Sequence, residues 1–229
     1  MSEDGNQVRS ALVAVGTKAL AVRSETLIKR GLALAKSLHP GDAAAHYHLG
    51  VALWEKGNID GAIAENRIAV RLQPDYAEAH MALGLMLYDY KGDTDGAIAE
   101  YREALRLNPN LAGVHYHLGV ALYKKGDLDG AIAERRVDVR LQPDSALAHH
   151  ELGAMLYDGK GDLNGAIEEF RIVNRLSPDN ALAHYDLAVA LERKQNFQEA
   201  LQEYRVAHEL NPQNPDYRTA YERLVEETR

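Results

Sequence analysis

A leucine–glycine pair returns along this chain at a nearly constant interval. It begins at Leu49, Leu83, Leu118 and Leu152, which are separated by 34, 35 and 34 residues. Prolines follow the same interval, at Pro74, Pro109, Pro143, Pro178 and Pro212. A fixed period of this length is typical of stacked repeats, each of which buries its apolar face against its neighbours. We therefore expect a stack of equivalent units rather than one globular core.

The period divides the 229 residues into full copies and two ends. The full copies are 43–76, 77–111, 112–145, 146–180 and 181–214. The second and fourth contain one additional residue each, Tyr90 and Gly159. A degenerate N-terminal helix pair is predicted at 9–42, after a tail at 1–8. Residues 215–229 are predicted to form a capping helix, because the end of a stack needs a polar outer side.

Inside each copy the apolar residues follow helical spacing over two segments. A glycine is expected to end the first helix in the left-handed conformation, at Gly57, Gly92, Gly126 and Gly161. The next residue is expected to cap the second helix, at Asn58, Asp93, Asp127, Asp162 and Asn196. We expect the second helix to start on an alanine, at Ala62, Ala97, Ala131, Ala166 and Ala200, and to end before the proline.

This arrangement resembles the tetratricopeptide repeat (TPR) family. In the second copy the matching residues are Leu83, Gly84, Ala97, Tyr101, Ala104, Leu107 and Pro109, and the resemblance extends over 43–214. It implies an all-α fold, a right-handed helical-hairpin solenoid of about six repeats plus a C-terminal capping helix. It also implies a protein–protein interaction scaffold or adaptor, whose concave groove binds a peptide or helix of a partner.

The first helix of each copy has two faces, because successive residues turn by about 100°. Positions 4, 7, 8 and 11 form the packing side, which is His46, Leu49, Gly50 and Leu53 in the first full copy. Positions 2, 5, 6, 9 and 13 lie opposite, with position 12 at the edge, and the resemblance implies that they line the groove. We expect a partner to contact Tyr47, Val51, Trp54, Met81, Leu85, Tyr88, Tyr116, Val120, Tyr123, His150, Tyr157, Tyr185 and Val189.

Alternatives stay open for these positions. The aromatic residues are common in the family and pack partly between neighbouring helices, so packing could account for them. Position 9 is aliphatic in every copy where family grooves often carry Asn, which favours an apolar contact line over family variation. The nearby acids favour a partner with Lys or Arg, or serve solubility alone. They are Glu55, Glu78, Asp89, Glu151, Asp158, Asp186 and Glu192, against Lys124 and Arg193.

Several partner classes are excluded at this stage. The formal net charge of −8 argues against nucleic acid, which requires clustered Lys and Arg. No apolar run approaches the ~18 residues of a membrane helix, so no membrane insertion is expected. The acidic N-terminus does not resemble a signal peptide, which predicts either a cytoplasmic protein or one whose targeting segment was removed. Family grooves that clamp the terminal carboxylates of chaperones use Lys, Arg and Asn, whereas the corresponding residues here are Tyr47, Val51, Ala82, Gly113 and His117.

Neither a metal, a cofactor nor an enzymatic activity is expected. Cysteine is absent. Five of the ten histidines, His46, His80, His115, His149 and His184, recur at position 4, which predicts a packing role. His48 and His117 lie two residues beyond such a histidine, a spacing that does not share a metal on a helix. The segment 93–96 suits helix capping better than calcium binding, and each candidate acid or base recurs once per copy, as architecture does.

Two further features concern the copies themselves. Residues 46–114 and 115–183 align over 69 positions, of which 44 are identical, so a two-copy module is duplicated. This leaves open a self-assembling protein, or a repeat domain taken from a larger or engineered protein. In the third full copy, Arg135 and Asp138 replace the usual aromatic and alanine. We expect them to pair on one helix face, either as a soft spot or as a specific contact with copy 146–180.

Overall fold

The computed structural model describes residues 41–228, which are helical and contain no strand. They divide into two compact units at residue 114, and each unit is described by itself. Unit 1 contains α2 (Ala43–Glu55), α3 (Ile59–Leu72), α4 (Ala77–Met86), η1 (Leu87–Lys91) and α5 (Thr94–Leu107). Unit 2 contains α6 (Val114–Lys125, of which Val114 is the last residue of unit 1), α7 (Leu128–Leu141), α8 (Ala146–Ala154), η2 (Met155–Lys160), α9 (Leu163–Leu176), α10 (Ala181–Arg193), α11 (Phe197–Leu210) and α12 (Pro215–Glu227). The predicted tail and, apart from Gly41 and Asp42, the predicted degenerate copy lie outside the described residues.

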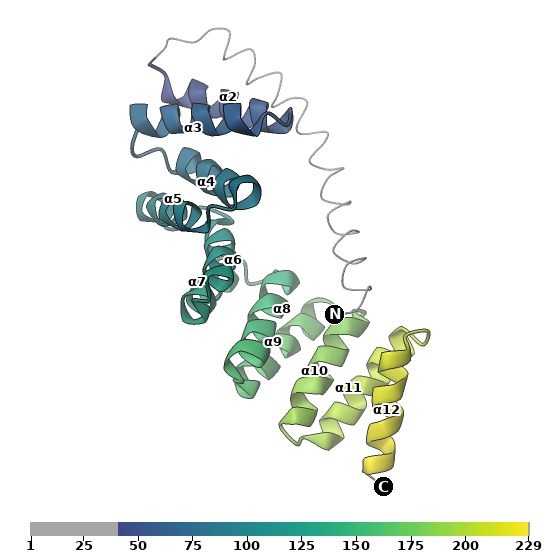
Figure 1. Ribbon diagram of the computed structural model, residues 1–229. Coiled ribbons are helices and arrows are strands. Elements are labelled where there is room, and N and C mark those ends of the chain that lie inside the picture. The colour runs from purple at the N-terminus through teal and green to yellow at the C-terminus, as the bar shows by residue number, and fades with distance from the viewer. Residues whose placement is uncertain (1–40, 229) are drawn as a thin grey trace. The chain divides into compact units, whose positions relative to one another are not determined.

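Within each unit, helices that follow one another in sequence pack side by side (Figure 1). In unit 1, α2 packs on α3, α3 on α4 and α4 on α5. In unit 2, α8 packs on α9, α9 on α10, α10 on α11 and α11 on α12. Contacts between sequence neighbours are the defining feature of a solenoid. The predicted all-α, helical-hairpin fold class is therefore confirmed.

The predicted turns are present, with two corrections. Gly57, Gly92, Gly126 and Gly161 adopt positive φ, and in the last copy a non-glycine residue, Gln195, does so with φ 65°. Four of the five predicted caps accept a hydrogen bond from a backbone N–H of the second helix: Asn58, Asp93, Asp127 and Asp162. The fifth prediction is wrong, because Asn196 makes no such cap and instead donates from Nδ2 to Glu199.

The start of the second helix was also predicted too late. Each second helix begins three residues before the expected alanine, for example at Ile59 rather than Ala62. The capping residue explains this, because the helix starts immediately after the side chain that accepts its free N–H groups. Ala62 instead lies within the helix and is completely buried.

The additional residue of the second and fourth copies is accommodated by a π-helical turn. η1 follows α4 without a break and contains Tyr90, and η2 follows α8 and contains Gly159. A π turn takes in one extra residue while the helix continues, and such turns frequently mark functional positions. The lysine that ends each π turn contacts the second helix of the preceding copy, Lys91 with Asp60 and Lys160 with Asp129.

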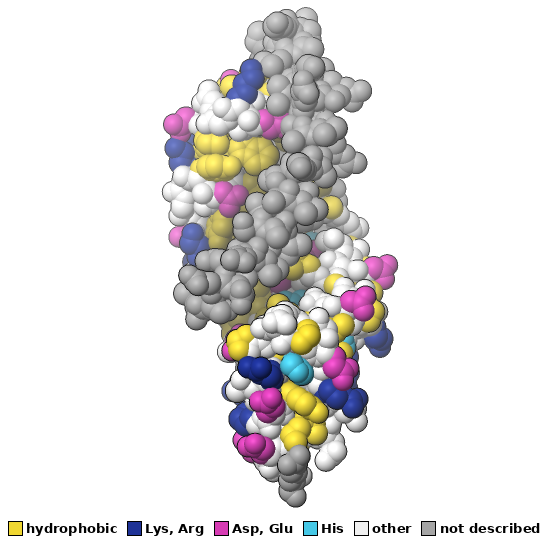
Figure 2. Space-filling model, turned by 90° about the vertical axis from the view of Figure 1, so that its right-hand side faces the viewer, with side chains coloured by type: hydrophobic (Ala, Val, Ile, Leu, Met, Phe, Trp, Pro, Cys, Tyr) yellow, Lys and Arg dark blue, Asp and Glu magenta, His cyan; other side chains and the backbone are white. Residues whose placement is uncertain are grey.

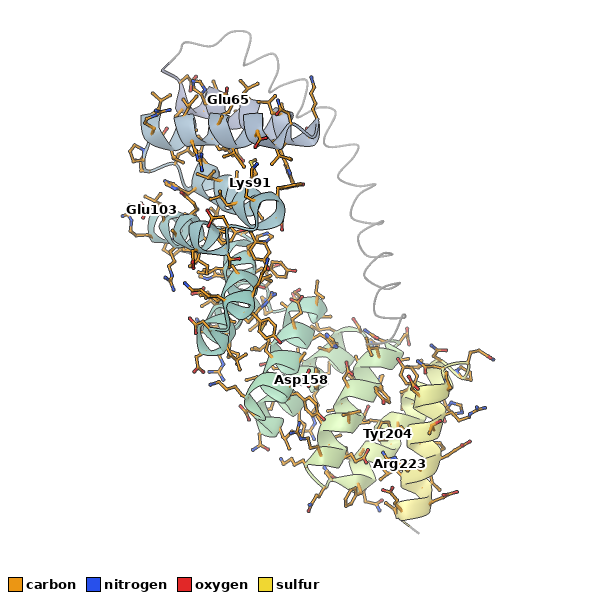
Figure 3. All side chains as sticks on the ribbon, viewed as in Figure 1. Glu65, Lys91, Glu103, Asp158, Tyr204 and Arg223 are labelled. Atoms are coloured by element: carbon orange, nitrogen blue, oxygen red, sulfur yellow. The ribbon has the colours of Figure 1, made fainter. Side chains whose placement is uncertain are left out.

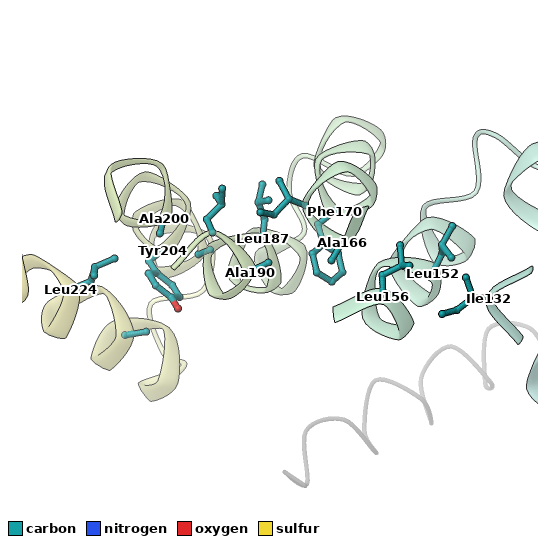
Figure 4. Close-up of a cluster of buried hydrophobic side chains, with 14 residues drawn as sticks. Ile132, Leu152, Leu156, Ala166, Phe170, Leu187, Ala190, Ala200, Tyr204 and Leu224 are labelled. Carbon is teal, nitrogen blue, oxygen red and sulfur yellow. The ribbon is translucent and has the colours of Figure 1, made fainter. Parts of the chain in front are cut away.

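The core of unit 2 runs along the interior between successive helices (Figure 4). It includes Leu152 and Leu156, which lie on the predicted packing side, and Phe170 from the second helix of the same copy. The aromatic ring lies so close to the first helix that a Cβ at Gly153 would be 2.7 Å from it. Tyr217, Ala220 and Leu224 are buried on α12, so this helix covers the end of the core of unit 2.

Candidate partner-binding groove

The predicted groove residues of unit 1 lie on α2, α4 and η1. They are Tyr47, Val51, Trp54, Met81, Leu85 and Tyr88, and each is partly exposed. We refer to these six residues as the unit 1 groove face. Partial exposure of an apolar set at helical spacing leaves a surface that a partner could cover. The packing alternative also has support, because the Tyr47 ring lies 5.1 Å from that of Tyr76. Burial raises the pKa of Tyr47, and it raises the pKa of Tyr76 to about 12.

Trp54 has a polar partner that the sequence did not indicate. Its Nε1 donates a hydrogen bond of 2.9 Å to the hydroxyl of Tyr90, the additional residue of the second copy. The π turn places this tyrosine beside the groove face, where it is 51% exposed. The sequence signal for this contact was the aromatic residue at the insertion, Tyr90, which lies two residues after groove position 12.

The predicted groove residues of unit 2 lie on α6, α8, η2 and α10. Six of them are partly exposed: Tyr116, Val120, His150, Tyr157, Tyr185 and Val189. Tyr123 is the most open of the set, with 54% of its surface exposed. These seven residues form the unit 2 groove face. Tyr185 also packs against Tyr204 and Tyr217, and burial raises its pKa.

Two leucines belong to the same side and were missed. Leu147 and Leu182 occupy position 2 of their copies and are 56% and 42% exposed. Only Glu78 and Gly113 were weighed at this position, although an apolar residue there extends the predicted contact line. Figure 2 shows hydrophobic side chains exposed among acidic and basic ones on the part of the surface that is visible in that view.

The Arg135–Asp138 pair forms as expected, and it connects to the groove face. Arg135 is 1% exposed, and its Nη1 lies 3.3 Å from Asp138 and 2.9 Å from the Glu151 carboxylate. Its Cζ lies 4.0 Å from the centroid of the Tyr116 ring, a cation–π distance. Asp138 also accepts a hydrogen bond from Gln142. The contact with copy 146–180 is therefore present through Glu151.

A second polar pair joins α8 and α10. Nε2 of His150 lies 2.7 Å from the Asp186 carboxylate, and both side chains are just over one-quarter exposed. The hydrogen bond to Asp186 raises the pKa of His150, which burial opposes. Both residues were predicted to face the groove, but their pairing was not predicted.

Not every predicted acid is open to a partner. Glu192 accepts hydrogen bonds from the Tyr204 hydroxyl and from Arg223 of α12, which lie close together in Figure 3. The bond from Arg223 lowers the pKa of Glu192. Arg193 is also engaged, with its guanidinium 5.0 Å from the centroid of Tyr157. Glu192 therefore joins α10 to the capping helix α12 from the groove side.

The five histidines at position 4 do more than pack. Nδ1 of each lies 2.6 Å from a glutamate oxygen on the second helix of its copy. The glutamates are Glu65, Glu100, Glu134, Glu169 and Glu203. In three copies Nε2 also contacts the carbonyl of the preceding proline. The sequence signal for these pairs is a Glu that recurs 19 or 20 residues after each His.

Across residues 41–228, no three His, Asp or Glu side chains are arranged so that they could hold a metal ion. None of the helices in this range is both long and apolar enough to cross a membrane.

Comparison with known proteins identifies the repeats. The family model described as tetratricopeptide repeat matches residues 23–77 and 151–215, and one described as TPR repeat matches 87–126. No curated protein matches the chain.

Several solved structures share the fold. YrrB, described as a TPR protein with an unusual peptide-binding site, has 23% identity and a TM-score of 0.72, covering 83% of this chain and 98% of its own. MamA has 26% identity and a TM-score of 0.63, covering 71% of this chain and 94% of its own. PilF of Pseudomonas aeruginosa has 24% identity and a TM-score of 0.59, covering 80% of this chain and 83% of its own. The family matches, the repeat length and the stacked hairpins agree, and the chain belongs to the tetratricopeptide repeat family.

Proposed function

We propose that this protein is an interaction scaffold that binds an apolar segment of a partner protein along its groove faces. The observation that carries the proposal is the set of partly exposed apolar and aromatic side chains at positions 5, 9 and 12 of successive first helices. Membership in the TPR family supports a scaffold role in general. These groove side chains are apolar and aromatic, which supports an apolar partner segment, because the burial of apolar surface is the main favourable term in most protein association.

The charges favour a segment that also carries Lys or Arg. Glu78 and Asp89 in unit 1, and Asp158 in unit 2, are exposed near the groove faces. Acidic groups beside an apolar strip raise the rate of association with a basic partner and disfavour acidic ones. Either a helix or an extended peptide can use such a surface.

Selection from a random peptide library displayed on phage tests the proposal. Peptides that bind the immobilised full chain are synthesised and titrated against Leu85→Glu and Val189→Glu, which place a charge on each groove face. We expect at least a tenfold loss of affinity for one of them, because a buried unpaired carboxylate opposes binding. Ala99→Glu, on the exposed side of α5, is the matched control. Equal affinity of all three variants would place the binding surface elsewhere.

Self-assembly is the competing use of the same surface. The exposed leucines Leu147 and Leu182 favour it, since a second copy would remove them from water. Sedimentation velocity over a hundredfold range of concentration separates the two functions. A mass that rises with concentration, and that Leu147→Glu abolishes, would support self-assembly instead of a peptide partner.

A further inference from the structure

We infer that unit 2 binds a tyrosine side chain of the partner beside Tyr123, at the place that Tyr90 fills beside Trp54 in unit 1. This inference rests on the proposed function, because the partner is the segment that binds the groove faces, and it names one residue type of that segment. The two units contain copies of one module. The side chain that unit 1 supplies for itself therefore indicates what unit 2 can accept from outside.

The π turns of the two units have the same local structure. Each is followed by a glycine in the left-handed conformation, with φ 65° at Gly92 and 66° at Gly161. The residue after each glycine donates its backbone N–H over 2.9 Å to a leucine carbonyl at the start of the turn or just before its middle. The last lysine of each turn contacts an aspartate on the second helix of the preceding copy. Positions 90 and 159 are therefore equivalent, and so are positions 54 and 123.

In unit 1 the place beside position 54 is filled by the protein itself. The indole Nε1 of Trp54 donates a hydrogen bond of 2.9 Å to the Tyr90 hydroxyl. Tyr90 remains 51% exposed, and Trp54 is partly exposed. Tyrosine combines an apolar ring with a polar edge, which suits a position that is half in contact with protein and half in water.

In unit 2 the same place has no side chain of its own. Gly159 stands where unit 1 has Tyr90, and Tyr123 stands where unit 1 has Trp54. Tyr123 is 54% exposed. No other side chain between residues 41 and 228 forms a hydrogen bond, an aromatic contact or a cation–π contact with it. Its ring and its hydroxyl are therefore both open to a ligand.

Position 12 is engaged from within the protein in other copies of unit 2 as well. The guanidinium of Arg193 lies 5.0 Å from the centroid of the Tyr157 ring. Glu192 accepts a hydrogen bond from Arg223 of α12. Among the five residues at position 12, all of which lie between 41 and 228, Tyr123 is the most exposed. It is therefore the position-12 residue best placed to meet a partner.

The neighbour of Gly159 explains why unit 2 does not supply the ring. A Cβ on Gly159 would lie 2.7 Å from Cδ2 of Leu128, so a larger residue there requires this leucine to move. Unit 1 has Ile59 at the equivalent position. The ring beside Tyr123 must therefore come from another molecule.

The chemistry of Tyr123 favours tyrosine over other apolar residues. A phenolic hydroxyl both donates and accepts, so the hydroxyl of a partner tyrosine can bond to it as that of Tyr90 bonds to Trp54. Aromatic pairs also contribute more than their buried area alone. Phenylalanine would keep the ring contact and lose the hydrogen bond, and an aliphatic residue would lose both.

The test uses the phage-library peptides whose binding to the full chain is weakened at least tenfold by Val120→Glu. Val120 belongs to the unit 2 groove face and lies three residues before Tyr123 on α6. We expect these peptides to share a tyrosine. Its replacement by alanine should weaken binding at least tenfold, and its replacement by phenylalanine at least threefold, because only the hydrogen bond is then lost. Isothermal titration calorimetry measures these affinities.

Two protein variants connect the preference to Tyr123. Tyr123→Phe should abolish the preference for tyrosine over phenylalanine, because the peptide hydroxyl then has no partner. Leu128→Ile/Gly159→Tyr copies the arrangement of unit 1 and should weaken the tyrosine peptides at least tenfold, since the protein's own ring then fills the place. Tyr90→Phe removes the equivalent hydroxyl in unit 1 and is the matched control, which should leave these affinities unchanged. Circular dichroism melts establish that each variant folds.

The outcomes separate this inference from the proposed function. The inference is overturned, and the proposed function stands, if peptides that Leu85→Glu or Val189→Glu weakens are unaffected by Val120→Glu or share no tyrosine. A preference for tyrosine that survives in Tyr123→Phe also overturns it, and this variant decides if the double variant does not fold. Peptides that bind all three glutamate variants as well as the unsubstituted chain would overturn both proposals.

Discussion

At the scale of single residues, one position of the repeat has different environments in different copies. The glycine at position 8 faces an aromatic ring in the second copy and Arg135 in the third. A Cβ on Gly84 would lie 2.7 Å from Tyr101, whereas one on Gly119 would make ordinary contacts at 3.4 Å and beyond. Glycine is therefore required at Gly84, where the ring approaches closely, whereas a larger residue can replace Gly119 in the third copy.

The two glycines should respond oppositely to the same substitution. Gly84→Ala forces the Tyr101 ring to move and should lower the free energy of unfolding by ~1–3 kcal/mol. Gly119→Ala has room for its methyl group and should raise it by up to ~1 kcal/mol, because alanine is the better helix former. Urea unfolding followed by circular dichroism measures both. Destabilisation by Gly119→Ala would show that the space beside Arg135 is tighter than described.

The His150–Asp186 pair should make stability depend on pH. The pKa of His150 in the folded protein is raised above its ordinary value of 6.5, so the pair stabilises the fold fully below that value. The contribution is lost as pH rises through the raised pKa. The difference in unfolding free energy between the unsubstituted chain and Asp186→Asn should therefore be larger at about pH 6 than at about pH 8.5. A difference independent of pH would rule out this linkage, and NMR titration of His150 provides a direct check.

At the scale of helices and turns, the sequence predicted the pattern of elements because each signal is local. Glycine at 57, 92, 126 and 161 and the capping residue after it determine where one helix ends and the next begins. The π turns were not predicted, because one inserted residue fits a longer loop as well as a wider helical turn. The contacts of Arg135 with Glu151, and of each histidine with its glutamate, join separate helices, so spacing within one helix could not indicate them. The predicted groove residues lie on the first helices of the copies and on the π turns that continue them.

The turn between α10 and α11 differs from the other four and provides a test at this scale. Gln195 has φ 65°, in the region where the equivalent residues are glycines. The left-handed conformation costs a residue with a Cβ roughly 1 kcal/mol. Gln195→Gly should therefore stabilise the protein by up to ~1 kcal/mol in thermal or urea unfolding. Gly126→Ala, the reverse change in an equivalent turn, should destabilise it, and equal effects of the two substitutions would contradict the explanation.

At the scale of the whole molecule, stability is distributed over contacts between neighbouring copies. The core of unit 2 extends from Ile132 to Leu224, and its last contribution comes from α12. In a solenoid the end copy depends on its cap, because nothing else covers its apolar side. The ion pair between Arg223 and Glu192 fastens this helix at the groove side.

Removal of α12 should therefore destabilise the adjacent copy first. A chain that stops at residue 214 loses the cover over Tyr185, Tyr204 and Leu191, and should melt at a lower temperature with a broader transition. Hydrogen exchange should show the loss of protection concentrated in α10 and α11. Arg223→Ala is the milder companion and should cost ~1 kcal/mol or less, as exposed ion pairs usually do. Unchanged exchange in α10 after truncation would contradict the capping role.

The bond between Trp54 and Tyr90 has a consequence for observing this protein. The chain contains a single tryptophan, and it lies on the unit 1 groove face with its indole N–H bonded to the tyrosine of the π turn. Its fluorescence is therefore a built-in optical probe of that one surface. A ligand that binds the unit 1 groove face changes the tryptophan emission, whereas a ligand that contacts only residues of unit 2 leaves the emission unchanged. A fluorescence titration can therefore show which of the two groove faces a candidate ligand occupies.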